Sequence, residues 1–208
     1  MNSLTLETIY WILFAIPSIL IASTVHEYAH GWMATKFGDP TPKAYGRLTL
    51  NPLAHIDPLG ALSMLIFRFG WSKPVPINSR NFDNEKLGIA LTSLAGPASN
   101  IIMLLITALI NYILKPDANS LFFTFLVTFA MINLVLAIFN LIPIPPLDGH
   151  KIVGSLLPQK VGYYWESLEK YQIVFIILLV IPIFPFGSIA SFLIGSISSK
   201  ALLLLGFF

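Results

Sequence analysis

The sequence contains no cysteine and few charged residues. Without cysteine, the chain can form no disulfide, no thiolate metal site and no cysteine nucleophile. Charged residues make up 11% of the 208 residues, against about 25% in soluble proteins. This scarcity excludes disordered, collagen-like and nucleic-acid-binding classes, which need polar or charged sequence. The net charge of +2 is too small to indicate a charged partner.

Hydrophobic residues are abundant, at 56% of the chain with a mean hydropathy of +0.79. A soluble protein of 23.0 kDa could not bury that much apolar surface, so we expect a polytopic protein embedded in the lipid bilayer. Four uncharged stretches reach the roughly 18–20 residues that cross a bilayer as a helix: 8–25, 87–114, 118–147 and 171–199. The last one contains Pro182 and Pro185, so it is either one broken helix or two short ones. We predict an all-α membrane protein with about four to six transmembrane helices.

The segment 38–85 differs from the rest because it is rich in proline, glycine and asparagine. Its pieces 44–50 and 73–77 favour short β-strands. The apolar stretch 58–71 is too short to span a bilayer and is typical of a re-entrant piece. We predict a short membrane-associated β/re-entrant insertion here, too small to be a soluble domain. The chain is then a single membrane-embedded domain, 1–208, with a catalytic core at about 8–155.

The lysines and arginines predict the orientation in the membrane. If the first helix runs from outside to inside, ten of the 12 lie on the cytoplasmic side, and only Lys115 and Lys200 lie outside. The opposite topology would reverse this ratio. We therefore expect a multi-pass protein of the cell membrane with its N-terminus outside. No cleavable signal peptide is expected, because no basic region precedes Ile9.

The first predicted helix carries the motif His26-Glu27-Tyr28-Ala29-His30. Residues four apart lie on one helix face, so both imidazoles can reach one ion, and Glu27 beside them can accept a proton from the attacking water. Ionisable groups inside a membrane are costly and usually functional, which favours a zinc site over a polar cluster that only packs helices together. His26 lies about 25 Å of helix beyond Ile9, so the site is expected within the membrane, near its cytoplasmic side.

Two histidines leave a zinc site one protein ligand short. The candidates are Asp39, His55, Asp57, Asp148 and His150. Asp39 is a poor choice because it comes only nine residues after His30, where we expect it just beyond the end of the helix. Asp148 follows a span that returns to the cytoplasmic side, so it is expected at the depth of His26 and His30. The proline-rich turn before Asp148 breaks the helix and can aim its carboxylate inward. Asp148 alone would be read as a turn residue at the interface, but with the two histidines it becomes the favoured ligand.

Three further polar positions have a simpler reading. Small residues at 96–100 favour close helix packing, although Asn100 can also hydrogen-bond near the metal. Asn133 is expected to make a hydrogen bond between helices. His55 is expected to be a loop residue, with a role in the site as the alternative.

The His26–His30 motif is followed much later by Asn140-Leu141-Ile142-Pro143-Ile144-Pro145-Pro146-Leu147-Asp148-Gly149. This pair of motifs resembles the site-2 protease family of intramembrane zinc metalloproteases, and the blocks at 51–60 and 96–100 resemble that family too. The resemblance covers about residues 20–155. It points to the compact branch, because there is no room for a PDZ domain between 111 and 120 or for a CBS domain after the core.

The resemblance implies that His26, His30 and Asp148 bind one zinc ion per chain. It also implies that Glu27 is the catalytic base and that Asn140 helps to hold the substrate or the oxyanion. The reaction would be hydrolysis of peptide bonds within or next to transmembrane segments, so the partners would be membrane protein substrates and no nucleic acid. The alternative is a membrane metal-binding protein or transporter without proteolytic activity, which would not need Glu27.

Overall fold

The computed structural model describes residues 9–67, 70–180 and 189–207. This part of the chain is helical and contains no strand, which confirms the predicted all-α class. The elements in chain order are η1 (Trp11–Ala15), α2 (Ile16–Lys36), α3 (Thr41–Ala44), η2 (Pro52–His55), α4 (Pro58–Phe67), η3 (Ser79–Asn81), α5 (Glu85–Leu114), α6 (Leu121–Asn140), α7 (Asp148–Leu156), α8 (Gln159–Glu166), η4 (Ser167–Tyr171), α9 (Gln172–Val180) and α10 (Ile189–Leu204).

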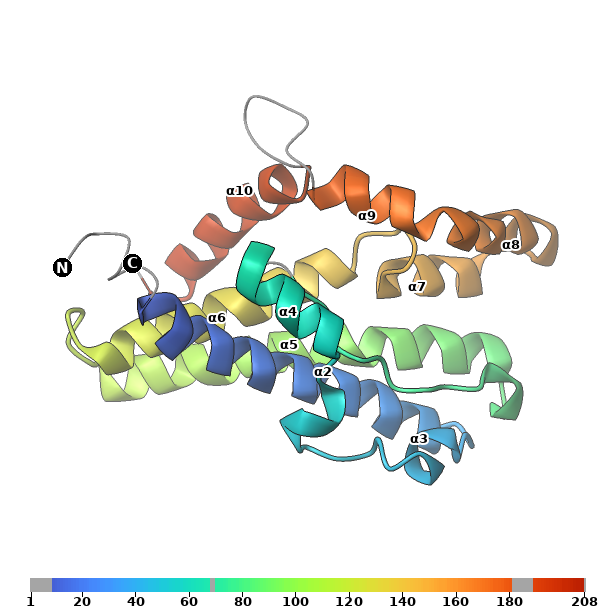
Figure 1. The fold of residues 1–208 in the computed structure, drawn as a ribbon, viewed down its shortest axis with the longest axis horizontal. Coiled ribbons are helices and arrows are strands. Elements are labelled where there is room, and N and C mark those ends of the chain that lie inside the picture. The colour runs from blue at the N-terminus through green and yellow to red at the C-terminus, as the bar shows by residue number, and fades with distance from the viewer. Residues whose placement is uncertain (1–8, 68–69, 181–188, 208) are drawn as a thin grey trace.

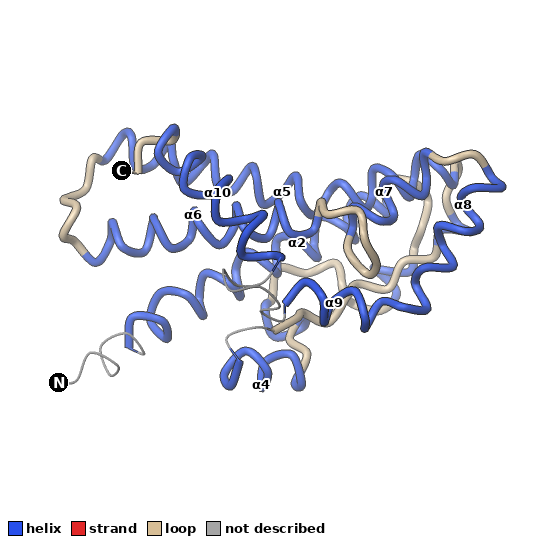
Figure 2. Tube along the Cα trace, turned by 90° about the horizontal axis from the view of Figure 1, so that it is seen from above, coloured by secondary structure: helices blue, strands red, loops and turns tan. Residues whose placement is uncertain are grey.

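Three helices of the described residues are long and apolar enough to cross a membrane: Ile12–Lys36, Glu85–Leu114 and Leu121–Asn140. They correspond to η1 with α2, to α5 and to α6. In Figures 1 and 2 these helices run side by side along the long axis of the molecule. The start of α2 lies toward one end of this bundle, and α3 and α8 lie toward the other. The first helix therefore carries the chain from one end of the bundle to the other.

Short polar signals set the limits of the long helices. The chain leaves α2 through Gly38, whose φ of +97° lies in the left-handed region that glycine adopts most easily. At the start of α5, the side chain of Asn84 accepts a hydrogen bond from the backbone N–H of Leu87 over 3.1 Å. At the start of α6, Ser120 Oγ accepts one from the N–H of Phe123, also over 3.1 Å. Both caps satisfy helix donors that would otherwise lack a partner.

The insertion between α2 and α5 differs in part from its prediction. Residues 44–50 do not form a strand, because α3 ends at Ala44 and a turn follows at Gly46, whose φ is +65°. Residues 73–77 have no regular secondary structure, and one isolated antiparallel bridge, between Ile56 and Ser72, is the only β pairing among the described residues of this region. The short apolar piece forms α4, whose ten residues reach about 15 Å and cannot span a bilayer.

The main hydrophobic core lies where α5, α6 and α10 meet. Its buried members are Leu104, Ala108, Leu126, Ala130, Leu134, Leu202 and Phe207. The side chain of Asn111 closes this end by donating a hydrogen bond to the carbonyl of Gly206 over 3.0 Å. The predicted break at Pro182 and Pro185 lies outside the described residues.

Candidate metal centre

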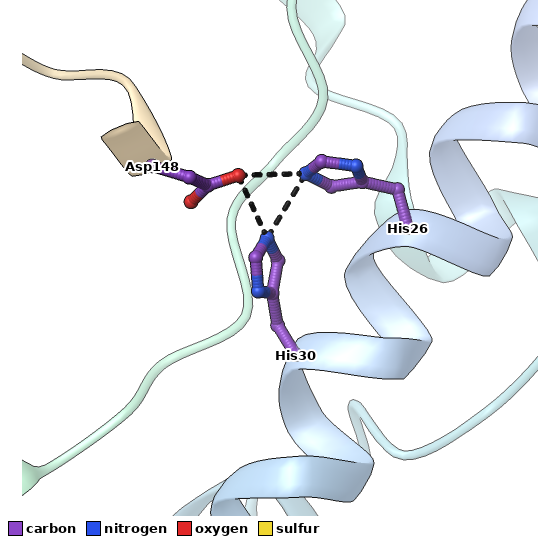
Figure 3. A group of neighbouring side chains, drawn as sticks. All are labelled: His26, His30 and Asp148. Carbon is purple, nitrogen blue, oxygen red and sulfur yellow. Dashed lines mark hydrogen bonds and ion pairs between the residues drawn. The ribbon is translucent and has the colours of Figure 1, made fainter. Parts of the chain in front are cut away.

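Three side chains from two distant parts of the sequence converge inside the bundle. His26 and His30 project from α2, and Asp148 projects from the first turn of α7 (Figure 3). Asp148 Oδ2 lies 3.2 Å from Nε2 of each histidine, and the two Nε2 atoms are 2.9 Å apart. All three residues are buried, and they are the group among the described residues that could hold a metal ion. The structure thus brings together the three residues predicted as zinc ligands.

The far side of each histidine ring is held by α5. His30 Nδ1 lies 2.7 Å from the backbone carbonyl of Thr92, and His26 Nδ1 lies 2.7 Å from Oδ1 of Asn100. A carbonyl oxygen can only accept a hydrogen bond, so Nδ1 of His30 must carry the proton. Its Nε2 is then free to present a lone pair to a metal.

The orientation of Asn100 fixes the proton of His26 in the same way. Asn100 Nδ2 donates to the carbonyl of Ala22 over 3.2 Å and to Oδ1 of Asn133 over 3.0 Å. Asn133 is oriented in turn, because its Nδ2 donates to the carbonyl of Phe129 over 2.9 Å. The amide oxygen of Asn100 must therefore face His26 and accept from its Nδ1–H. The hydrogen bond expected from Asn133 between helices is confirmed.

The converging atoms are all hydrogen-bond acceptors. Each histidine Nε2 presents a lone pair, and the carboxylate of Asp148 can only accept. Asp148 Oδ2 is buried and has no hydrogen-bond donor among the described residues. Two lone pairs and an anionic oxygen held this close together favour a cation between them. Imidazole nitrogen and carboxylate oxygen are the ligands typical of a catalytic zinc, so the residues present fit that ion.

The histidine pair rests directly on Gly96 of α5. A Cβ atom at this position would lie 2.4 Å from His30 Nε2 and 2.6 Å from both Cε1 and Nε2 of His26. Any side chain would displace the two rings from the position in which they face Asp148. The small residues predicted to allow close helix packing therefore also make room for the two histidine rings.

Glu27 is buried next to His26, and both of its carboxylate oxygens are held by the segment before α5. Oε1 accepts a hydrogen bond from Ser72 Oγ and Oε2 accepts one from the N–H of Val75, each over 2.9 Å. Neither partner was predicted. Ser72 is a single hydroxyl in a loop and Val75 contributes only its backbone, so no sequence pattern marks either of them.

The other candidate ligands lie elsewhere. Asp39 accepts hydrogen bonds from Thr41, Asn78 and Asn81. Asp57 accepts one from the N–H of Gly60 at the start of α4.

The two histidines outside the motif also have partners of their own. His55 donates from Nε2 to the carbonyl of Thr49. His150 is buried against Trp165, with the ring centroids 5.1 Å apart. Asn140, which was predicted to help hold the substrate or the oxyanion and not the metal, donates to the carbonyl of Leu136 within α6.

A buried glutamate beside a two-histidine, one-carboxylate group, set among helices of membrane length, is typical of a membrane-embedded metallohydrolase. Residues 110–185 match the model described as peptidase family M50. The chain is 39% identical over 186 residues to "Putative zinc metalloprotease YwhC" of Bacillus subtilis (strain 168), covering 84% of this chain and 82% of the relative. Rip2 of Mycolicibacterium smegmatis, which carries the same description, is 25% identical over 88% of this chain and 78% of its own length. No solved structure matches the chain.

The chain belongs to peptidase family M50, the site-2 protease family. It is an intramembrane zinc metalloprotease, as its motifs predicted, and the transporter alternative is not favoured. Its cofactor is zinc.

Proposed function

We propose that His26, His30 and Asp148 hold the catalytic zinc and that Glu27 is the base for hydrolysis of peptide bonds within or next to transmembrane segments. The observation that carries this proposal is the convergence of three acceptor atoms without a donor, beside a buried glutamate. We further propose that residues 1–208 form a single protease domain whose catalytic core is about 8–155, because the ligands come from α2 and α7.

When bound, zinc supplies a Lewis acid that polarises the scissile carbonyl and activates water. The protein residues have three tasks. His26 and His30 offer Nε2 because their Nδ1 protons are held by α5. Glu27 accepts the proton of the attacking water and passes it to the leaving amine. Asn140, in the last turn of α6, is our candidate for holding the substrate backbone or the developing oxyanion.

We also propose that the N-terminus is outside and that the active site lies within the membrane near the cytoplasmic side. The lysine and arginine distribution supports this orientation. The count of four to six spans is supported by the three long helices and by the apolar stretch 171–199. The length of α4 supports a re-entrant piece, since about 15 Å of helix does not cross a bilayer of about 30 Å.

The substrates we propose are membrane proteins with a transmembrane helix, since the site lies among helices of membrane length. A helix in lipid keeps its carbonyls in internal hydrogen bonds, so the substrate has to unwind locally before attack. Glycine or proline near the scissile bond should therefore speed cleavage.

The test is co-expression with a panel of tagged single-span membrane proteins, comparing wild type with Glu27→Gln. We expect wild type to cleave at least one member of the panel and Glu27→Gln to cleave none. The two proteins should contain the same amount of zinc. Equal cleavage by Glu27→Gln would contradict the role of Glu27. Metal uptake that is unchanged in Glu27→Gln, with no member cleaved by wild type, would favour the metal-transport alternative.

A further inference from the structure

The backbone N–H and the backbone carbonyl of Lys73 are both hydrogen-bonded within the insertion. Arg47 Nη2 donates a hydrogen bond to the Lys73 carbonyl over 2.5 Å, and the Lys73 N–H donates to the carbonyl of His55 over 2.8 Å. Lys73 lies between the two residues that contact Glu27, namely Ser72 and Val75. Both carboxylate oxygens of Glu27 thus accept hydrogen bonds from one segment. The backbone of that segment is itself held by hydrogen bonds at Lys73, between the two contacting residues.

Arg47 is an unusual residue for this place. Only 7% of its surface is exposed, and it forms no ion pair with an acidic side chain among the described residues. Its Nη2 also lies 3.4 Å from His55 Nδ1. Because His55 Nε2 faces the carbonyl of Thr49 over 2.9 Å, Nε2 carries the ring proton and Nδ1 presents a lone pair to the guanidinium. Burying a charge without a counter-ion is costly, so the position of Arg47 needs a reason beyond packing.

We infer that Arg47, supported by His55, is a positioning residue for Glu27. It fixes the 72–75 segment so that the Ser72 hydroxyl and the Val75 N–H hold the carboxylate in one orientation. This inference rests on the proposed role of Glu27 as the base. A base has to be placed to within a fraction of an ångström of its productive position, so a loosened segment should slow the reaction while leaving the metal in place.

The first measurement is hydrogen–deuterium exchange of purified protein, followed by mass spectrometry over residues 70–77. We expect Arg47→Met to speed exchange of the Lys73 and Val75 amides by about tenfold or more. These amides keep their own acceptors, His55 O and Glu27 Oε2, but the segment that carries them loses the hydrogen bond to the Lys73 carbonyl and opens more often. Arg47→Lys, which keeps one donor for the Lys73 carbonyl, should recover part of the protection. Arg80→Met is the matched control, because Arg80 is exposed and the same charge is removed.

The second measurement is steady-state cleavage of a tagged single-span protein that wild type cuts, with zinc measured on the same samples. We expect Arg47→Met to lower kcat by about 10- to 100-fold with KM nearly unchanged and zinc at the wild-type level. Ser72→Ala removes only a hydroxyl and should lower kcat without speeding amide exchange at Lys73. It tests the inference even where Arg47→Met does not fold.

Wild-type kcat and wild-type exchange in Arg47→Met would overturn the inference, as would wild-type kcat in Ser72→Ala. A loss of zinc together with kcat in Ser72→Ala would also overturn it, because the segment would then support the metal and not Glu27. If Glu27→Gln itself keeps full kcat, the proposed function fails instead. The two failures are therefore distinguishable.

Discussion

The amide oxygen of Asn100 accepts a hydrogen bond from Nδ1 of His26 over 2.7 Å. This bond joins α5 to α2 and decides which nitrogen of His26 faces Asp148. Both residues are buried, so no bulk water competes for either group. The partner of a ligating histidine sets the orientation and basicity of its ring, and Asn100 is itself oriented by Ala22 and Asn133.

Replacing Asn100 with alanine should therefore weaken zinc binding by about 10- to 100-fold, because the His26 ring loses the partner that fixes its proton. The measurement is competition with a zinc chelator on purified protein. Asn111→Ala is the matched control, since Asn111 lies on the same helix but bonds to Gly206. A zinc affinity that is equal in both variants would contradict the role of Asn100.

Gly96→Ala should abolish stoichiometric zinc binding. The added Cβ would lie 2.4 Å from His30 Nε2, and a buried ring pair in a packed helix interface has little room to move. Gly195→Ala provides the comparison, because a Cβ there meets nothing within 4 Å and alanine favours helix. Metal analysis of the two purified variants separates them. Normal zinc content in Gly96→Ala would show that the rings can shift without losing the site.

Asp39 should make stability depend on pH below neutral. Its burial alone would raise its pKa, but hydrogen bonds from Thr41, Asn78 and Asn81 outweigh this and hold the pKa below its usual value. A lowered pKa stabilises the folded chain above the unfolded-state pKa of about 3.9, and this contribution is lost as the pH falls through the folded-state pKa.

Asp39→Asn should consequently be less stable than wild type at neutral pH, by about 1–3 kcal/mol, since hydrogen bonds to a charged acceptor are the stronger ones. The difference should shrink as the pH falls below about 4. Thermal unfolding in detergent, measured for both proteins from pH 7 to pH 3, tests this. A difference that stays constant across the range would mean that the Asp39 carboxylate does not drive it.

The sequence was sufficient to predict the helical class, the family and the convergence of His26, His30 and Asp148. Membrane helices are marked by long uncharged stretches, and the two histidines sit four residues apart, so both signals are local. Asp148 could be added because helix counting placed it at the same depth as His30. The structure bears out this convergence, although Asp148 lies more than a hundred residues away in sequence.

The support around Glu27 could not be predicted. The Lys73 peptide is held by Arg47 and by a backbone carbonyl of His55, and Glu27 is held by a backbone N–H of Val75. Backbone donors and acceptors look alike at every position of a sequence. The strand predicted at 44–50 does not form, because the chain turns at Gly46 with a left-handed φ. The β propensity of the surrounding residues is a small effect that does not prevent this turn. Packing in three dimensions decides such features.

The most direct test of the account is the zinc content of purified protein, prepared without a histidine tag and dialysed against a weak chelator. We expect about one zinc per chain in wild type and in Glu27→Gln, because Glu27 is not a ligand. We expect almost none in the double variant His26→Ala/His30→Ala or in Asp148→Ala, which lose ligands. Full zinc occupancy in the double histidine variant would contradict the central claim that these side chains form the metal centre.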